Sequence, residues 1–258
     1  NGQGPYYTIA PVKWRELDNS GGQLLLLSDQ SLDVRAYHDS LTSITWADCS
    51  LRAWLNGTFF SDAFSSVERG AVAATSHDSV SDQIFLLSRD EAGNGSYFPT
   101  DESRKVSNTA YAAGRKNDTT SSVGSFAGSW WLRSPGRTPD RAGAVTSDGV
   151  LGSGDGAQVD IDIYGVRPAF NLASSAVLFT SAAQGGKDDA VVDSALTAVG
   201  WATGEWKLTL LDTSRSSFSA SASRNSAAVG DTVAISFSGA GTGSNEYVSA
   251  MLVNSSGS

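Results

Sequence analysis

The sequence contains very little cysteine, histidine or positive charge. Cys49 is its single cysteine, which excludes an internal disulfide framework and a zinc site built from cysteines. His38 and His77 are its two histidines, so histidine-based catalysis has few candidates. The 27 acidic side chains outnumber the 18 basic ones, which gives a formal charge of -9. We therefore expect no nucleic-acid partner, because that binding depends on neutralising phosphates.

Long hydrophobic runs are also missing from the sequence. The longest, Leu24–Leu27, is far too short to cross a bilayer, so we expect no direct membrane insertion. Hydrophobic residues make up 40% and charged residues 17%, a composition typical of folded rather than disordered chains. The sequence shows no initiator methionine, signal peptide or anchor, and we interpret it as a fragment of a longer protein.

Changes of composition along the 258 residues predict one domain of ordinary size and a smaller one. Residues 1–172 hold most of the aromatic residues and arginines, and 173–212 are interpreted as a connecting β segment. From residue 213 the chain is rich in Ser, Ala and Gly, with short alternating apolar stretches such as Thr232–Phe237. Residues 213–258 are therefore predicted to begin a small all-β, immunoglobulin-like module.

Residues 1–172 mix helix and strand patterns. A hairpin is predicted over 11–28, and a helix capped by Thr45 is predicted to end at Asn56-Gly57. Short helices should begin after Ser65 and Ser88, each of which is followed three residues later by Glu. These helices, with the strands predicted further along the chain, indicate an α+β fold.

The later part of this domain is predicted to contain mainly strands. We expect a strand over 83–88, long loops over 97–129, and a hairpin over 144–151 that turns at Asp148-Gly149. Residues 158–164 alternate, which predicts a strand with its apolar side chains on one face and Asp160, Asp162 and Tyr164 on the other. Trp14, Leu26, Trp54, Phe85, Leu132 and Val166 are predicted to share one buried core.

Two motifs place large or charged side chains in apolar surroundings. Adjacent Trp130 and Trp131 should point to opposite faces of a strand, so at least one fills the core. The other is open to two interpretations, a second core residue or a flat platform for a sugar. Arg133 and Arg167 are predicted to be structural, buried against carboxylates or loop carbonyls.

Seven segments then carry a resemblance. They are Pro11–Arg15, Leu24–Ser28, Thr45–Asn56, Phe85–Ser88, Trp130–Gly136, Ser147–Gly149 and Gly165–Phe170. In this order they resemble a bacterial domain family of unassigned function that is common in surface proteins of gut Firmicutes and Actinobacteria. The resemblance implies a C-type-lectin-like fold, akin to the formylglycine-generating enzymes. It also implies kinship with the variable proteins of diversity-generating retroelements. In those proteins, the stretch between the motifs that correspond to Trp130–Gly136 and Gly165–Phe170 is diversified for ligand binding.

Polar residues between these motifs form the predicted ligand surface. It consists of Arg137, Asp140, Arg141, Ser147, Asp148, Ser153, Asp155, Gln158, Asp160, Asp162 and Tyr164. Turn residues and outward strand residues can change without harming the core, which is why these positions suit binding. The acids among them are interpreted as a solvated face rather than a calcium site, because no Asp-x-Asp-x-Asp-Gly loop occurs.

We therefore expect a non-catalytic ligand-binding module, of adhesin or receptor type, on a bacterial cell surface. Its ligand would be a protein or glycan on a host or bacterial surface, and no cofactor or metal is expected. A diversity-generating retroelement variable protein is one form of this hypothesis. Two alternatives stay open, an enzyme on the same fold and a structural stalk domain. The single Cys49 cannot supply the redox-active cysteine pair that formylglycine-generating enzymes use.

Overall fold

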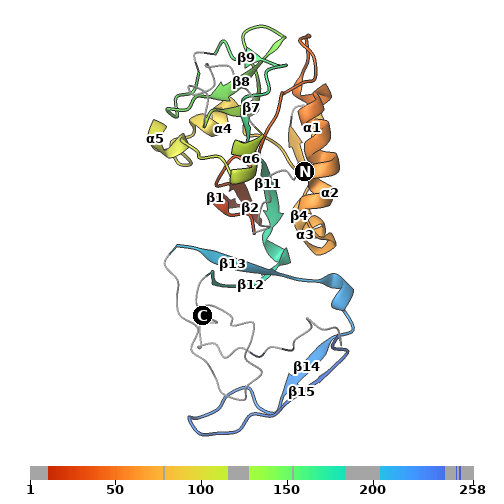
Figure 1. The fold of residues 1–258 in the computed structure, drawn as a ribbon. Helices are drawn as coiled ribbons and strands as arrows, with labels where there is room; N and C mark the ends of the chain where they lie inside the picture. The colour runs from red at the N-terminus through yellow and green to blue at the C-terminus, as the bar shows by residue number, and fades with distance from the viewer. Residues whose placement is uncertain are drawn as a thin grey trace, which may run out of the picture. The chain divides into compact units, whose positions relative to one another are not determined.

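The computed structural model describes residues 11–77, 79–115, 128–152, 154–183 and 204–241, together with residues 248 and 250. The chain divides into two compact units, Asn1–Leu210 and Leu211–Ser258 (Figure 1). The strands of the predicted connecting segment 173–212 are part of the first unit. No helix in the described ranges is long and apolar enough to cross a membrane.

Two sheets organise the first unit. The four-stranded sheet has the order β1-β2-β11-β4 and is antiparallel throughout. The five-stranded sheet has the order β3-β10-β7-β8-β9, in which only the β10–β7 pair is parallel. The bounds are β1 Trp14–Ser20, β2 Gln23–Ser28, β3 Asp33–Val34, β4 Val72–Ala73, β7 Trp130–Pro135, β8 Arg141–Val145, β9 Ala157–Gln158, β10 Gly165–Val166 and β11 Ala169–Ala173.

Short helices and two small ribbons complete the first unit. The ribbons pair β5 Thr75–His77 with β6 Val80–Asp82, and β12 Val177–Ala182 with β13 Trp206–Leu210. The α-helices are α1 Ser50–Trp54, α2 Phe60–Ala63, α3 Ser66–Ala71, α4 Arg89–Gly93, α5 Asp101–Arg104 and α6 Ala110–Gly114. Single 3-10 turns occupy Trp46–Asp48 and Ser174–Ala176. This mixture confirms the α+β fold class.

Local sequence signals account for the elements that were predicted correctly. The first hairpin turns at Gly21-Gly22, where both φ angles are positive, as a two-residue hairpin turn requires. Ser65 and Ser88 each form the expected capping box, with Glu68 and Glu91 respectively. In each of these cases the residues that fix the conformation lie within three positions of one another.

The core confirms most of the predicted packing. Leu26, Phe85, Leu132 and Val166 belong to one buried cluster, and Trp14 and Trp54 pack against it while partly exposed. Trp130 and Trp131 are both fully buried. Their indole nitrogens donate to backbone carbonyls of Arg104 (3.2 Å) and Arg35 (2.8 Å), which satisfies both polar groups inside the core. The sugar-platform interpretation of this pair is therefore wrong.

The predicted end of the first helix at Asn56-Gly57 is also wrong. The helical column continues from α1 through a π-helical turn, Leu55–Phe59, into α2 (Figure 1). The Asn56 side chain donates to the carbonyls of Arg52 and Ile84 and accepts from the backbone N–H groups of Gln83 and Ile84. Asn56 therefore ties the helix to the core instead of terminating it.

Two predicted strands are irregular in the structure. Residues 83–88 form a single bridge, between Phe85 and Ala169, although Ile84–Leu87 are all buried. The strand expected over 158–164 ends at Gln158 and continues as turns. The predicted loop region 97–129 contains α5 and α6, and its residues 116–127 lie outside the described residues.

The second unit shows one small ribbon in its described part. β14 Ser219–Ala222 pairs antiparallel with β15 Ile235–Ser238, after a 3-10 turn at Thr213–Arg215. The predicted Thr232–Phe237 segment thus pairs within this unit. Ile235 and Phe237 stay exposed at 45% and 54%, so the ribbon buries little apolar surface of its own.

Candidate functional site

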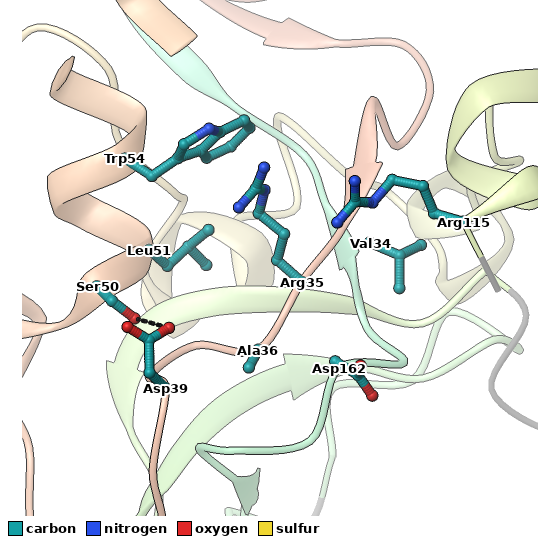
Figure 2. A pocket seen from close by; sticks show the side chains of 9 residues that line it. All are labelled: Val34, Arg35, Ala36, Asp39, Ser50, Leu51, Trp54, Arg115 and Asp162. Atoms are coloured by element: carbon teal, nitrogen blue, oxygen red, sulfur yellow. Dashed lines mark hydrogen bonds between the residues drawn. The ribbon is translucent and has the colours of Figure 1, made fainter. Parts of the chain in front are cut away.

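Two adjoining cavities of the first unit share Arg35 and Trp54, and we call them together the Arg35–Trp54 groove. The first encloses about 320 Å³ and the second about 410 Å³. The first is lined by Val34, Arg35, Ala36, Asp39, Ser50, Leu51, Trp54, Arg115 and Asp162 (Figure 2). The second is lined by Leu32, Asp33, Arg35, Trp54, Thr58, Phe59, Asp62, Ala63 and Tyr111.

Three parts of the fold build the walls of the groove. β3 and the segment after it supply Asp33 to Asp39 along one side. The helical column from α1 to α2 supplies the residues from Ser50 to Ala63, so its unexpected continuation past Gly57 makes the second cavity. α6 and the residue after it bring Tyr111 and Arg115. π-helical turns such as the one at Leu55–Phe59 occur frequently at functional sites.

A buried carboxylate organises the charged side chains. Asp33 has a side chain only 5% exposed, and its Oδ1 accepts from the backbone N–H of Val34 at 2.8 Å. The Nε groups of Arg35 and Arg115 lie 2.8 Å and 3.0 Å from its two oxygens. A hydrogen bond to Tyr111 and the charge of Asp33 raise the pKa of Arg115. One buried negative charge is thus shared by two arginines.

Arg35 also lies over an aromatic ring. The centre of its guanidinium group is 4.0 Å from the Trp54 ring centroid, a cation–π contact, and the side chain is 34% exposed. Phe59 packs on Trp54 at 5.1 Å. Within the described part of the chain, Asp33 is the only hydrogen-bond partner of the Arg35 side chain. The two terminal nitrogens of Arg35 therefore remain able to donate to a ligand.

Acidic side chains surround these arginines. Asp39 Oδ1 accepts from the Ser50 hydroxyl at 3.0 Å, and Asp39 and Asp162 line the first cavity. Figure 2 shows Asp39 and Asp162 on opposite sides of Ala36, with Arg35 and Arg115 above them. Asp62 lines the second cavity. Donors and acceptors therefore alternate around the groove.

Of the eleven predicted site residues, Asp162 alone lines this groove. Arg137, Asp140, Arg141, Asp155 and Gln158 lie around the β8–β9 pair instead. Arg137 and Asp155 form an exposed ion pair at 3.5 Å, and Arg141 donates to the Gly156 carbonyl at 2.9 Å. A hydrogen bond from Thr138 lowers the pKa of Asp140.

The remaining predicted residues have separate locations. Ser147 and Asp148 lie in the turn after β8, where a hydrogen bond from Thr146 lowers the pKa of Asp148. Asp160 is exposed in the turns that follow β9, and Ser153 lies outside the described residues. Tyr164 was predicted to face outward but is 9% exposed, with its ring 4.4 Å from that of Trp131. The outward orientation predicted for Tyr164 is wrong. The strand ends at Gln158, so the alternation of its faces does not extend to residue 164.

The sequence did not single out Arg35, Trp54, Arg115 or Tyr111 as groove residues. One signal for Arg35 was present, because Asp33 and Arg35 have opposite charges and side chains two apart in an extended segment share a face. Arg115 has no comparable signal, because it is 82 residues away from Asp33 in the sequence.

The residues that were weighed as catalytic groups have structural contacts. His38 Nδ1 accepts from the backbone N–H of Ser50, and the His77 ring lies 4.2 Å from Phe85. Cys49 Sγ caps α1, and burial raises the pKa of its thiol to about 11. Within the described ranges no three His, Cys, Asp or Glu side chains are grouped closely enough to hold a metal ion.

Comparison with known proteins gives one match. No curated protein and no solved structure is similar to this chain. A family model does match, over residues 21–174, which include the five-stranded sheet, three strands of the four-stranded sheet and all the residues that line the groove. The chain therefore belongs to the family described as a domain of unknown function, DUF6273.

Proposed function

We propose that this protein is a non-catalytic ligand-binding module, of adhesin or receptor type, in a bacterial cell-surface protein with a C-type-lectin-like fold. The observation that carries the proposal is the Arg35–Trp54 groove. Its two cavities of about 320 and 410 Å³ are in the size range of small-ligand sites, and charged, hydroxyl and aromatic side chains line both. The ligand is a glycan or protein displayed on a host or bacterial surface.

The packing beneath the groove supports a rigid binding surface. Trp131 holds the backbone of Arg35 through its indole nitrogen, and Tyr37 packs on Trp131 at 5.6 Å. Asp33 fixes the inner end of both guanidinium groups. A site whose side chains are already positioned loses less entropy when a ligand binds, which favours affinity.

The exposed residues around β8–β9 provide a second place for a ligand on the same module. The Arg137–Asp155 pair has side chains that are 79% and 58% exposed, so both can change partners at little cost. This surface contains five of the eleven residues predicted from the sequence. A test of the proposed function must therefore separate the two surfaces.

The test measures binding of the 258-residue chain to panels of glycans and host-surface proteins. The groove variant combines Asp39→Asn and Asp162→Asn, and its matched control is Asp160→Asn, which changes an exposed acid outside the cavities. We expect the groove variant to weaken binding by about tenfold or more, the loss that follows from removing charged hydrogen bonds, while the control binds normally.

Two results would contradict the proposal. A folded chain that binds nothing on either panel would argue for a structural role. Loss of binding in an Arg137→Ala, Asp155→Ala variant, with full binding in the groove variant, would transfer the site to β8–β9.

A further inference from the structure

Two guanidinium groups meet one buried carboxylate at the base of the groove. Asp33 is contacted by Arg35 and by Arg115, each through its Nε atom. Arg115 also donates from one terminal nitrogen to the Tyr111 hydroxyl at 3.3 Å. The other terminal N–H donors of the two arginines have no hydrogen-bond partner in the described part of the chain.

A carboxylate is the ligand group that these donors fit. A guanidinium group presents its N–H donors in a planar fork that matches two carboxylate oxygens. The Arg35 and Arg115 side chains are 34% and 44% exposed, so a ligand can reach both. Figure 2 shows the Arg35 guanidinium group beside Trp54 and the Arg115 guanidinium group nearer Val34, both above Asp39 and Asp162 in this view.

The rest of the cavity fits hydroxyl groups. Asp39 and Asp162 line it, and ionised carboxylates act only as acceptors, so they bind hydroxyl donors well. Asp39 keeps one oxygen without a partner in the described part of the chain, and Asp162 makes no hydrogen bond there. Val34, Ala36 and Leu51 add apolar surface between these groups. A ligand with one carboxylate, several hydroxyls and an apolar ring face satisfies all of these contacts.

Other ligand classes fit less well. A peptide with several acidic side chains would be repelled by Asp39, Asp62 and Asp162 around the arginines. A neutral sugar would offer the terminal N–H donors of the two arginines only uncharged acceptors, which make weaker hydrogen bonds than a carboxylate does. A cationic ligand would compete with Arg35 for Trp54 and face two guanidinium groups.

We propose that the Arg35–Trp54 groove binds a sugar that carries a carboxylate, with the carboxylate between Arg35 and Arg115 and the hydroxyls on Asp39 and Asp162. This inference rests on the proposed function and names its ligand class. The adjoining cavity of about 410 Å³ gives a neighbouring sugar of the same glycan a place beside Trp54 and Tyr111.

The experiment is a calorimetric titration of the 258-residue chain with glucuronic acid and with N-acetylneuraminic acid. The methyl ester of each acid is the control, since it keeps the ring and hydroxyls and loses the charge. We expect each acid to bind about tenfold tighter than its ester, the contribution of one charge-assisted hydrogen-bonded contact. Added salt should weaken the acid more than the ester, because screening acts on charges.

Variants connect this preference to the groove. Arg115→Gln should remove the preference for acid over ester, because it weakens binding of the acid far more than binding of the ester. Arg224→Gln, at an exposed arginine of the second unit that lines neither cavity, should keep the preference. Thermal melts establish that both variants are folded before the titrations are compared.

The outcomes separate this inference from the proposed function. Equal binding of acid and ester, or an acid preference that survives Arg115→Gln, would overturn the carboxylate assignment and leave the groove as a binding site. Absence of sugar binding, together with a protein partner sensitive to Asp39→Asn and Asp162→Asn, would overturn the ligand class alone. The proposed function itself fails where no ligand on either panel binds the chain.

Discussion

Arg167 and Arg133, in the core, make different contacts from the groove arginines Arg35 and Arg115. All four belong to the first unit. Arg167 is 1% exposed, donates through Nε to the Ser28 carbonyl at 2.8 Å, and lies over the Trp130 ring at 5.0 Å. Arg133 donates to the Leu86 carbonyl and to Glu91. Both guanidinium groups lie inside the protein, although the buried Nη1 of Arg167 has no hydrogen-bond partner in the described part of the chain.

The groove arginines differ from these in exposure, since the Arg35 and Arg115 side chains are 34% and 44% exposed against 13% for Arg133. Arg35 and Arg115 each contact Asp33 through Nε, and both line the first cavity. Burial lowers the pKa of Arg167 to about 10. The pKa of Arg115 is instead raised, by its hydrogen bond to Tyr111 and by the charge of Asp33. The difference teaches that the role of an arginine follows from how far its guanidinium group is exposed, more than from the motif in which it occurs.

The largest expected effect in this comparison comes from Arg167→Ala. The substitution leaves a cavity beside Trp130 and an unpaired Ser28 carbonyl, so unfolding should become easier by about 3–5 kcal/mol. Urea denaturation of the 258-residue chain measures this loss. The volume-conserving Arg167→Met should recover part of it, because it fills the cavity and removes a buried charge. Equal stability of wild type and Arg167→Ala would show that this arginine is not part of the scaffold.

The sequence was sufficient where neighbouring residues determine the structure. The hairpin over 11–28 and the capping boxes at Ser65 and Ser88 follow from short-range patterns, and they were predicted. The structural roles of Arg133 and Arg167 were also predicted correctly, because a charged side chain in an apolar motif needs internal partners.

Long-range contacts account for most of what the sequence did not reveal. Asn56-Gly57 has the composition of a helix end. The helix nevertheless continues past it, because the Asn56 side chain bonds to the backbone of Gln83 and Ile84. The alternation over 158–164 does keep Val159 buried and Asp160 exposed, but turns rather than a strand produce it. The groove depends on pairing β3 with β10 and on placing Arg115 beside Asp33, and neither contact has a local signature.

A smaller effect is expected from the Arg133–Glu91 pair, and it depends on pH. Burial by itself raises the pKa of Glu91, but hydrogen bonds from Arg133 and from the Ser88 backbone outweigh it, so the pKa of this carboxyl falls below its ordinary value. A carboxylate with a lowered folded-state pKa stabilises the protein above its unfolded pKa, and this stability is lost as the pH falls through the folded-state value.

Glu91→Gln should therefore cost about 2 kcal/mol at pH 7, and the gap to wild type should close as the pH falls below about 4.5. Thermal melts from pH 7 to pH 3 measure it. Asp90→Asn is the control, since it changes an exposed acid in the same helix and should leave the pH dependence unaltered. A gap of constant size across this range would contradict the assigned stabilisation.

The smallest expected effect on stability comes from the groove. Arg115→Gln removes an ion pair whose arginine is 44% exposed, so the free energy of unfolding should fall by about 1 kcal/mol or less. Asp33 keeps its contacts with Arg35 and the Val34 backbone, which prevents a buried unpaired charge. Denaturation beside the control Arg137→Gln, expected within about 0.5 kcal/mol of wild type, measures the difference. A loss of several kcal/mol would place Arg115 with Arg167 in the scaffold, and the distinction between core and groove arginines would fail.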